Sequence, residues 1–287
     1  IKQTFSNFEI MQIFQSNKQI LLFLIQNKVI TIDESISHYF LYKEKSKYSH
    51  FFYPEIKSFI ENDQRIQIEK ELKEIDQNIL DNFEEKRQIC ENESHLCFLI
   101  RNDSIDDFIS YVNSKSIPLS ATIEPSLFET NHFLIDKKVT LIEYASFFGS
   151  IKIFQYLMLN EIQLEPSLWL YAVHGDNSEI IQALIENDIV PKYENYEDCF
   201  IESIKCHHNE IAIYIFENLL SINDKNTNNY IPLYFENYNY SFLMDLIDEE
   251  SSFFYLCKYQ YDILVNNFLE KKADEIKKFL VSFHFFK

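Results

Sequence analysis

Two groups of side chains in this chain have the residue types that bind zinc: Cys199 with Cys206, His207 and His208, and His95 with Cys97. Neither group has the paired C-x-x-C spacing of a structural zinc site. The step from Cys199 to Cys206 places both thiols on one face of a helix, where burial in a core is their ordinary role. We therefore predict no metal site, although the turn expected at Cys206 leaves the exposure of its thiol open.

Other catalytic arrangements have little support. A cysteine nucleophile needs a histidine that the fold brings near it, and no spacing in the sequence indicates such a pair. The chain contains only two glycines, Gly149 and Gly175, whereas soluble proteins use about 7% glycine. This shortage excludes the glycine-rich phosphate loops and the G-x-S-x-G elbow of hydrolases. We expect no enzymatic activity and no cofactor.

Three segments in the middle of the chain share one spacing of small, apolar and asparagine residues. The small residues are Ala145, Ala172 and Ser203. Twelve and fifteen residues after them come two further columns, Leu157, Leu184 and Ile215, and then Asn160, Asn187 and Asn218. The segments are 27 and 31 residues apart, a period typical of helical repeat proteins. A small residue is expected where the helices of adjacent repeats approach closely.

The asparagine column coincides with the expected end of each second helix. Because asparagine adopts positive φ more readily than most residues, we predict left-handed backbone at Asn160, Asn187 and Asn218. Pro166 and Pro191 follow two of them and prevent the helix from continuing.

The first of these segments resembles the ankyrin signature. The residues 140–145, Thr-Leu-Ile-Glu-Tyr-Ala, precede Gly149 and look like the Thr-Pro-Leu-His-x-Ala that opens an ankyrin repeat, with leucine and glutamate in place of the proline and the histidine. The whole chain is similar to the divergent ankyrin-like proteins of unknown activity that single-celled parasites carry in large numbers. The resemblance implies an all-α, ankyrin-like helical repeat solenoid. The residues 161–164 and 188–191 leave room only for reduced hairpin fingers.

The resemblance also implies where a partner would bind. In ankyrin-like repeats, the positions between the small residue and the glycine line the concave face. Here they are Phe147 and Phe148, Val173 and His174, and Lys205 and Cys206. We predict that Phe147, Phe148, His174 and Lys205 bind a protein, with burial of both phenylalanines against a neighbouring repeat as the alternative. Trp169 belongs to an apolar column and is expected to be structural.

The first ninety residues match the repeats less well. Residues 55–90 contain no glycine, and Ile68, Leu72, Ile75 and Ile79 recur at helical spacing, which predicts one long amphipathic helix. It either packs on a neighbouring repeat or forms a coiled-coil seam. Residues 114–138 are the expected insertion. We predict an N-terminal helical region over residues 1–90, with degenerate repeats and the long helix, and a repeat array over residues 91–287.

Composition restricts the partners. The formal charge of −19 disfavours nucleic acid and anionic membranes and is compatible with a basic protein. The longest apolar run near the start, residues 20–25, is too short for a membrane span. Five cysteines without a signal peptide indicate reduced thiols and a cytoplasmic location. We expect a scaffold that binds a protein through its concave face; the alternatives are a self-assembling structural protein and, third, an enzyme with an unrecognised site.

Overall fold

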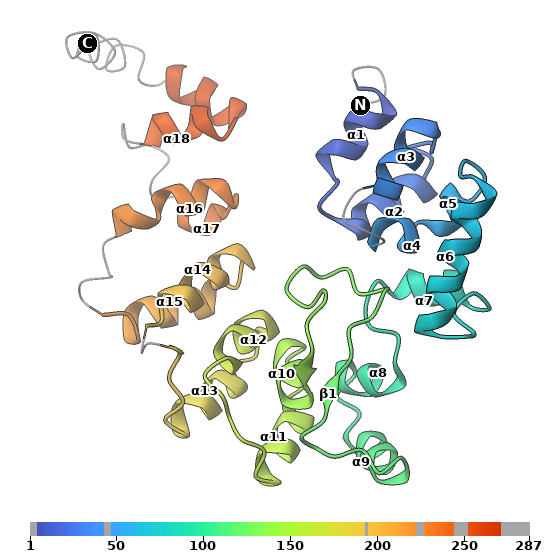
Figure 1. The fold of residues 1–287 in the computed structure, drawn as a ribbon. Coiled ribbons are helices and arrows are strands. Elements are labelled where there is room, and N and C mark those ends of the chain that lie inside the picture. Colours follow the sequence, from blue (N-terminus) through green and yellow to red (C-terminus); the bar gives the residue numbers. More distant parts are fainter. Residues whose placement is uncertain (1–4, 43–46, 193–194, 222–226, 244–251, 271–287) are drawn as a thin grey trace. The chain divides into compact units, whose positions relative to one another are not determined.

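The structure, a computed structural model, describes residues 5–42, 47–192, 195–221, 227–243 and 252–270. These residues are mostly helical, and the described strands form one antiparallel pair, so the prediction of an all-α chain is confirmed (Figure 1). The chain divides into two compact units, Ile1–Leu141 and Ile142–Lys287. The boundary predicted from the sequence, at residue 90, lies inside the first unit. No bilayer-spanning helix is found among the residues that the structure describes.

The first unit has an aromatic core beneath short helices. Its described elements are α1 (Asn7–Ile13), α2 (Lys18–Gln26), α3 (Glu34–Tyr42), α4 (Lys47–Phe51), α5 (Tyr53–Ile56), α6 (Asn62–Ile75), α7 (Phe83–Ile89), α8 (His95–Arg101), α9 (Ile105–Ser114), β1 (Thr122–Ile123) and β2 (Val139–Thr140). Phe40 and Phe52 stack in the core with ring centroids 4.6 Å apart. Phe128, from the segment between β1 and β2, is fully buried and packs edge-to-face on Phe83. The predicted insertion therefore contributes to this core.

The prediction of one long helix over residues 55–90 is wrong. Helix α6 ends at Ile75; the next residue, Asp76, has an extended backbone, and α7 begins only at Phe83. The Asp76 carboxylate accepts a hydrogen bond from the Asn78 N–H at 2.9 Å, and such local bonds compete with the helical backbone. Of the predicted stripe, Ile68 and Leu72 are buried, whereas Ile75 is 57% exposed. Ile79 is buried as well, from the turn that follows the helix.

A buried arginine connects two helices of this unit. The Arg87 side chain in α7 is only 1% exposed, and its two terminal nitrogens lie 2.6 and 2.7 Å from the two carboxylate oxygens of Glu55. It also donates to the Phe51 carbonyl and pairs with Glu84. Such a fork-to-fork pair has the geometry in which a buried charge is best compensated.

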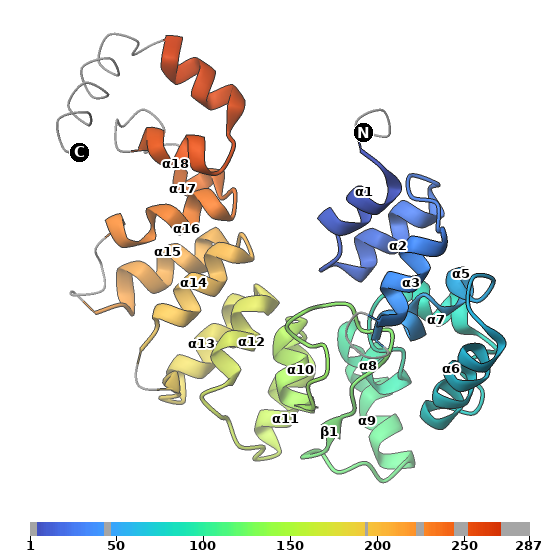
Figure 2. The same ribbon diagram turned by 45° about the horizontal axis from the view of Figure 1, so that its top comes forward.

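The second unit is a succession of helical hairpins (Figures 1 and 2). Its described elements are α10 (Leu141–Phe147), α11 (Ile151–Leu159), α12 (Leu168–Gly175), α13 (Ser178–Glu186), α14 (Glu197–Lys205), α15 (Asn209–Asn218), the 3₁₀ helix η2 (Thr227–Tyr230), α16 (Ile231–Glu236), α17 (Tyr240–Leu243) and α18 (Ser252–Lys258). Residues 262–270 are also helical. The first helices α12, α14 and α16 contact one another in turn, and α11 contacts α13.

Consecutive hairpins keep one register. The small residues Ala145, Ala172 and Ser203 are fully buried in α10, α12 and α14. Four residues after each small residue, and after Tyr234 in α16, the backbone is left-handed; the residues there are Gly149, Asp176, His207 and Tyr238. This backbone turns the chain from each first helix into the second. The sequence columns therefore mark equivalent places in consecutive hairpins.

The two glycines of the chain meet at the seam between the first two hairpins of this unit. A Cβ atom added to Gly175 would lie 2.1 Å from the Ser146 carbonyl oxygen and 2.9 Å from the Gly149 nitrogen. A Cβ atom added to Gly149 would lie 2.6 Å from the Gly175 carbonyl oxygen. Both positions need glycine because backbone lies directly against backbone, and Gly149 also has a φ of +65°.

Polar side chains connect each hairpin to the one before it. Five residues after Ala172, Ser203 and Tyr234, respectively, the side chains of Asn177, His208 and Asn239 donate hydrogen bonds to backbone carbonyls of the preceding hairpin. The acceptors are the carbonyl oxygens of Gly149 at 3.0 Å, Val173 at 2.6 Å and Ile204 at 3.1 Å. These carbonyl groups lie in the last turns of α12 and α14 and two residues past the end of α10. We call these hydrogen bonds the inter-hairpin ladder.

The prediction of left-handed backbone at the asparagine column is wrong. Asn160 and Asn187 have φ values of −91° and −97°. Their side-chain amides donate to the carbonyl four residues earlier, at 2.7 and 2.8 Å, and Asn218 does the same at 3.0 Å. The positive φ falls one residue later, at Glu161 and Asp188. Asparagine here caps the last turn through its side chain, and the next residue reverses the backbone.

Candidate functional site

A cluster of chemically active side chains lies where the first helices of two neighbouring hairpins end. His174 belongs to the last turn of α12, and Glu202 and Cys206 belong to the end of α14. The Cys206 sulfur lies 3.4 Å from His174 Nδ1, and Glu202 Oε1 lies 3.1 Å from His174 Nε2. The second oxygen of Glu202 lies 3.2 Å from the Lys205 ammonium. We call His174, Glu202 and Cys206 the His174 cluster.

The cluster is largely shielded from water. The side chains of His174 and Glu202 are 8% and 14% exposed, and Lys205 is 46% exposed. The ring of Phe147 stacks on the His174 ring, with centroids 4.9 Å apart. Phe147 itself is 7% exposed and contacts the ring of Phe148 edge-to-face. An apolar wall therefore closes one side of a polar cluster, while Lys205 reaches solvent.

The charges of the cluster depend on its burial and on its neighbours. The hydrogen bond from His174, followed by the ammonium of Lys205, lowers the pKa of Glu202 to about 2, although burial acts in the opposite direction. Burial, and then the negative charge of Glu202, raise the pKa of the Cys206 thiol to about 12. At neutral pH the cluster thus holds a carboxylate beside a protonated thiol.

The cluster lacks the electrostatics of a cysteine nucleophile. The order cysteine, histidine, carboxylate resembles the order of a cysteine-based triad. A cysteine nucleophile, however, acts as a thiolate and has a lowered pKa, whereas the pKa of Cys206 is raised. The same three side chains present nitrogen, oxygen and sulfur ligand atoms that all lie within 4.8 Å of one another. Among the described residues, they are the group of three whose geometry could hold a metal ion.

The structure brings together the residues that the resemblance marked for protein binding. Phe147 contacts both Phe148 and His174, and Lys205 joins them through Glu202. Phe147 is buried and Phe148 is partly exposed, so the two phenylalanines differ in the area they offer a partner. Trp169 is fully buried, and its indole nitrogen donates to the Ile189 carbonyl at 2.7 Å.

The other zinc-type side chains are used differently. Cys199 is fully buried in α14, and burial raises the pKa of its thiol to about 12. His207 is exposed at a left-handed position, and His208 belongs to the inter-hairpin ladder. His95 is exposed and Cys97 is buried, on different sides of α8. All five cysteines lie in the described part of the chain and are free thiols.

Reasoning from the sequence missed Glu202 and the contact between His174 and Cys206. His174 stands two residues after Ala172, and Glu202 and Cys206 flank Ser203. If the two repeat segments are aligned at Ala172 and Ser203, these three positions fall where the two first helices lie next to each other. This alignment is the sequence feature that could have predicted the contact.

A groove opens between the second helices α13 and α15. It has a volume of about 280 Å³ and is lined by Asp176, Ser178, Ile181, Gln182, Glu210, Ile211 and Tyr214. Ile181 and Ile211 are buried, and Tyr214 is 37% exposed. The carboxylates of Asp176 and Glu210 stand at the exposed turn and helix start beside them. We call this the α13–α15 groove.

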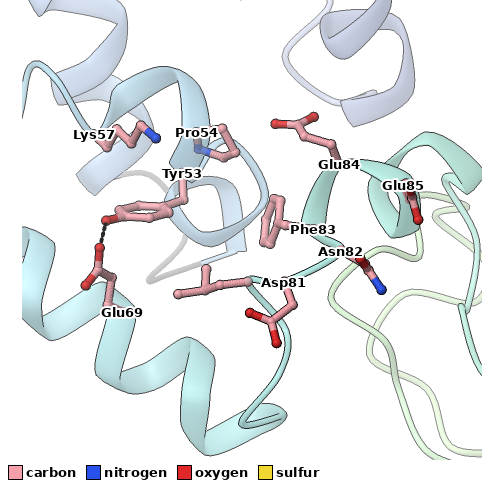
Figure 3. Close-up of a pocket in the computed structure, with 10 residues that line it drawn as sticks. Tyr53, Pro54, Lys57, Glu69, Asp81, Asn82, Phe83, Glu84 and Glu85 are labelled. Carbon is pink, nitrogen blue, oxygen red and sulfur yellow. Dashed lines mark hydrogen bonds between the residues drawn. The ribbon is translucent and has the colours of Figure 1, made fainter.

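A second groove, in the first unit, has a volume of about 440 Å³ and lies between α5, α6 and the start of α7 (Figure 3). The Tyr53 hydroxyl donates to the Glu69 carboxylate at its edge. Burial, and then Glu69, raise the pKa of Tyr53, so the hydroxyl stays protonated. Glu84, on another side, pairs with Arg87 at 2.6 Å. The contact of Tyr53 with Glu69 joins α5 to α6, and the pair of Glu84 with Arg87 lies within α7, so these polar groups already have partners.

Comparisons with protein-family models, with curated proteins and with solved structures give no match.

Proposed function

We propose that this chain is a protein-binding scaffold, built as a divergent ankyrin-like solenoid with short turns in place of hairpin fingers. The support is the common register of consecutive hairpins: a buried small residue, a left-handed residue four positions later and, in three successive hairpins, a ladder side chain five positions later. Units that repeat in this way stack on their neighbours and present one continuous surface. A preformed surface loses little conformational entropy when it binds.

The observation that carries the proposal is the α13–α15 groove. Its buried isoleucines and the exposed ring of Tyr214 form an apolar floor, and Asp176 and Glu210 give it a negative edge. Partly exposed aromatic rings in a pocket are typical binding anchors. The partner that fits is a protein segment with a large apolar side chain next to lysine or arginine. The net charge of −19 would speed the approach of such a basic partner.

The face around Phe147, Phe148, His174 and Lys205 is the second surface on which the same partner is expected. Phe148 and Lys205 are the members with exposed area, and the stacked pair of Phe147 and His174 supports them from below. Both surfaces belong to the second unit, and Asp176, at the turn after α12, lies beside the groove and close to His174 in the chain.

A displayed library of random peptides tests the proposal on the full chain. We expect the selected peptides to combine lysine or arginine with a large apolar residue. Tyr214→Ala should weaken binding of the best peptide by about tenfold or more, as expected for an aromatic anchor. Glu210→Gln should weaken it less and should reduce its salt dependence. The matched control is Leu159→Ala, which removes another exposed apolar side chain, 78% exposed on α11.

Phe148→Ala and Lys205→Ala test the second surface in the same binding assay. A loss of affinity with these two variants, and not with Tyr214→Ala, would move the binding surface to the ends of the first helices. Selected peptides without basic residues, or affinities that none of the four variants changes, would contradict the proposal. A molar mass that rises with protein concentration in light scattering, together with a failure to select peptides, would favour self-assembly instead.

A further inference from the structure

The His174 cluster joins two hairpins through three different kinds of ligand atom. His174 comes from α12, and Glu202 and Cys206 come from the end of α14. Their nitrogen, oxygen and sulfur atoms lie within 4.8 Å of one another. All three side chains come from two neighbouring hairpins of the second unit. It lies under the Phe147 ring, away from bulk water.

The chemistry of these ligand atoms fits a borderline-soft divalent cation. Zinc accepts imidazole, carboxylate and thiolate ligands at about 2.0 to 2.3 Å, and three protein ligands leave one position for water or another ligand. Ligand atoms around tetrahedral zinc are about 3.5 Å apart. The 3.4 Å between the Cys206 sulfur and His174 Nδ1 is close to this spacing, whereas Glu202 lies 3.1 Å from the opposite nitrogen, Nε2. Because these contacts use opposite ring nitrogens, the Cys206 or Glu202 side chain must rotate to share one cation.

The local charge also favours a dication. The Cys206 thiol releases its proton to solvent when the cation binds. The resulting thiolate and the Glu202 carboxylate together neutralise Zn²⁺, and the imidazole binds as a neutral ligand. Asp176 adds a further negative charge whose field reaches Cys206. Lys205 is the opposing charge, and it contacts the carboxylate oxygen that does not face His174. Its side chain is 46% exposed and can turn into solvent when a cation enters.

We propose that His174, Glu202 and Cys206 bind one zinc ion, which cross-links α12 to α14 and locks two neighbouring hairpins together. The ion would complete a tetrahedral site with a fourth ligand from solvent. Such a cross-link acts on the rigidity of the binding surface that these hairpins carry, and it is independent of whether the surface binds a protein.

Cobalt(II) replaces zinc as a spectroscopic probe of this site. Titration of the metal-free full chain with cobalt chloride should give a thiolate-to-cobalt charge-transfer absorption that saturates at one equivalent and that zinc chloride removes. Cys206→Ser should abolish this absorption, and His174→Gln should weaken cobalt binding by about 100-fold or more, since even outer-shell changes cost about 10- to 100-fold. The matched controls Cys257→Ser and His207→Gln change an exposed thiol and an exposed imidazole and should leave the absorption unchanged.

The unmodified chain provides a test that does not depend on the folding of any variant. X-ray absorption of the chain with one equivalent of zinc should show one sulfur neighbour at about 2.3 Å, with nitrogen and oxygen neighbours at about 2.0 Å. Absence of binding at one equivalent, absence of a sulfur neighbour, two or more sulfur neighbours, or a charge-transfer absorption that persists in Cys206→Ser would each overturn the proposal.

Discussion

Replacing Gly175 with alanine should destabilise the second unit, although alanine stabilises a helix better than glycine does. Gly175 is the last residue of α12, and alanine in a helix is normally more stable than glycine by about 0.5–1 kcal/mol. The new methyl group, however, would lie 2.1 Å from the Ser146 carbonyl oxygen, whereas real Cβ atoms essentially never come under 3.0 Å. The neighbouring atoms are backbone and cannot rotate away. The two hairpins must therefore separate by close to an ångström.

The size of the effect follows from these opposing contributions. Overpacking costs about 1–3 kcal/mol, and separating the hairpins also loosens the packing around Ala145 and Ala172, which are fully buried. After the gain in helix stability, we expect a net loss of about 2 kcal/mol. With a urea m-value of about 2 kcal/mol/M, the midpoint of unfolding falls by about 1 M.

Trp169 makes the measurement local. It is the single tryptophan of the chain and is fully buried in α12, so its fluorescence in a urea titration reports the hairpin that contains Gly175. Ser178→Ala, at the exposed start of α13, is the control and should change stability by less than about 0.5 kcal/mol. If Gly175→Ala is as stable as the unchanged chain or more stable, the hairpins do not approach at this seam and the deduced register is refuted.

Three further predictions concern single side chains. Asn187→Gly should cost about 1 kcal/mol in urea unfolding because it loses the capping bond to the preceding turn, whereas Asp188→Gly, at a φ of +54°, should be neutral or stabilising. Arg87→Ala should cost about 3–5 kcal/mol because it leaves a buried carboxylate without its partner. Glu129→Gln should raise the melting temperature near neutral pH, because burial raises the pKa of Glu129 and a raised pKa opposes folding once the group ionises.

Each of these has an outcome that would contradict it. Equal effects of glycine at positions 187 and 188 would show that the left-handed residue is not Asp188. The control for Arg87→Ala is Lys86→Ala, which removes a more exposed ion pair with Asp76 and should cost less than about 1 kcal/mol of stability. A loss as small as this in Arg87→Ala would mean that Arg87 is solvated. The advantage of Glu129→Gln should vanish below about pH 4, and an advantage that persists there would have a cause other than ionisation.

The small-residue column of the sequence marked buried positions in three successive first helices of the second unit. Small residues at 145, 172 and 203 have a single physical reason, the close approach of helices, and that reason acts at each copy. The long helix over residues 55–90 was wrong because apolar spacing does not report the bond by which Asp76 ends a helix. The asparagine column does mark the ends of the second helices, but the predicted left-handed backbone falls one residue later. The asparagine caps the helix through its side chain, and the residue after it reverses the backbone.

The candidate site could be predicted only in part. The position of His174 followed from its place between a small residue and a turn. Its partners Glu202 and Cys206 are 28 and 32 residues away along the chain, and their contact depends on how one hairpin rotates on the next. Burial then decides the protonation of the thiol, and burial is a property of the packed hairpins.

In the inter-hairpin ladder, each hairpin donates a hydrogen bond to the hairpin before it. Asn239 satisfies the Ile204 carbonyl, His208 the Val173 carbonyl and Asn177 the Gly149 carbonyl. Loss of one rung removes a contact between neighbouring hairpins at the end of the earlier first helix, so we expect local opening to begin there. Amide hydrogen exchange after Asn239→Ala should accelerate first at the end of α14 and only later at α12.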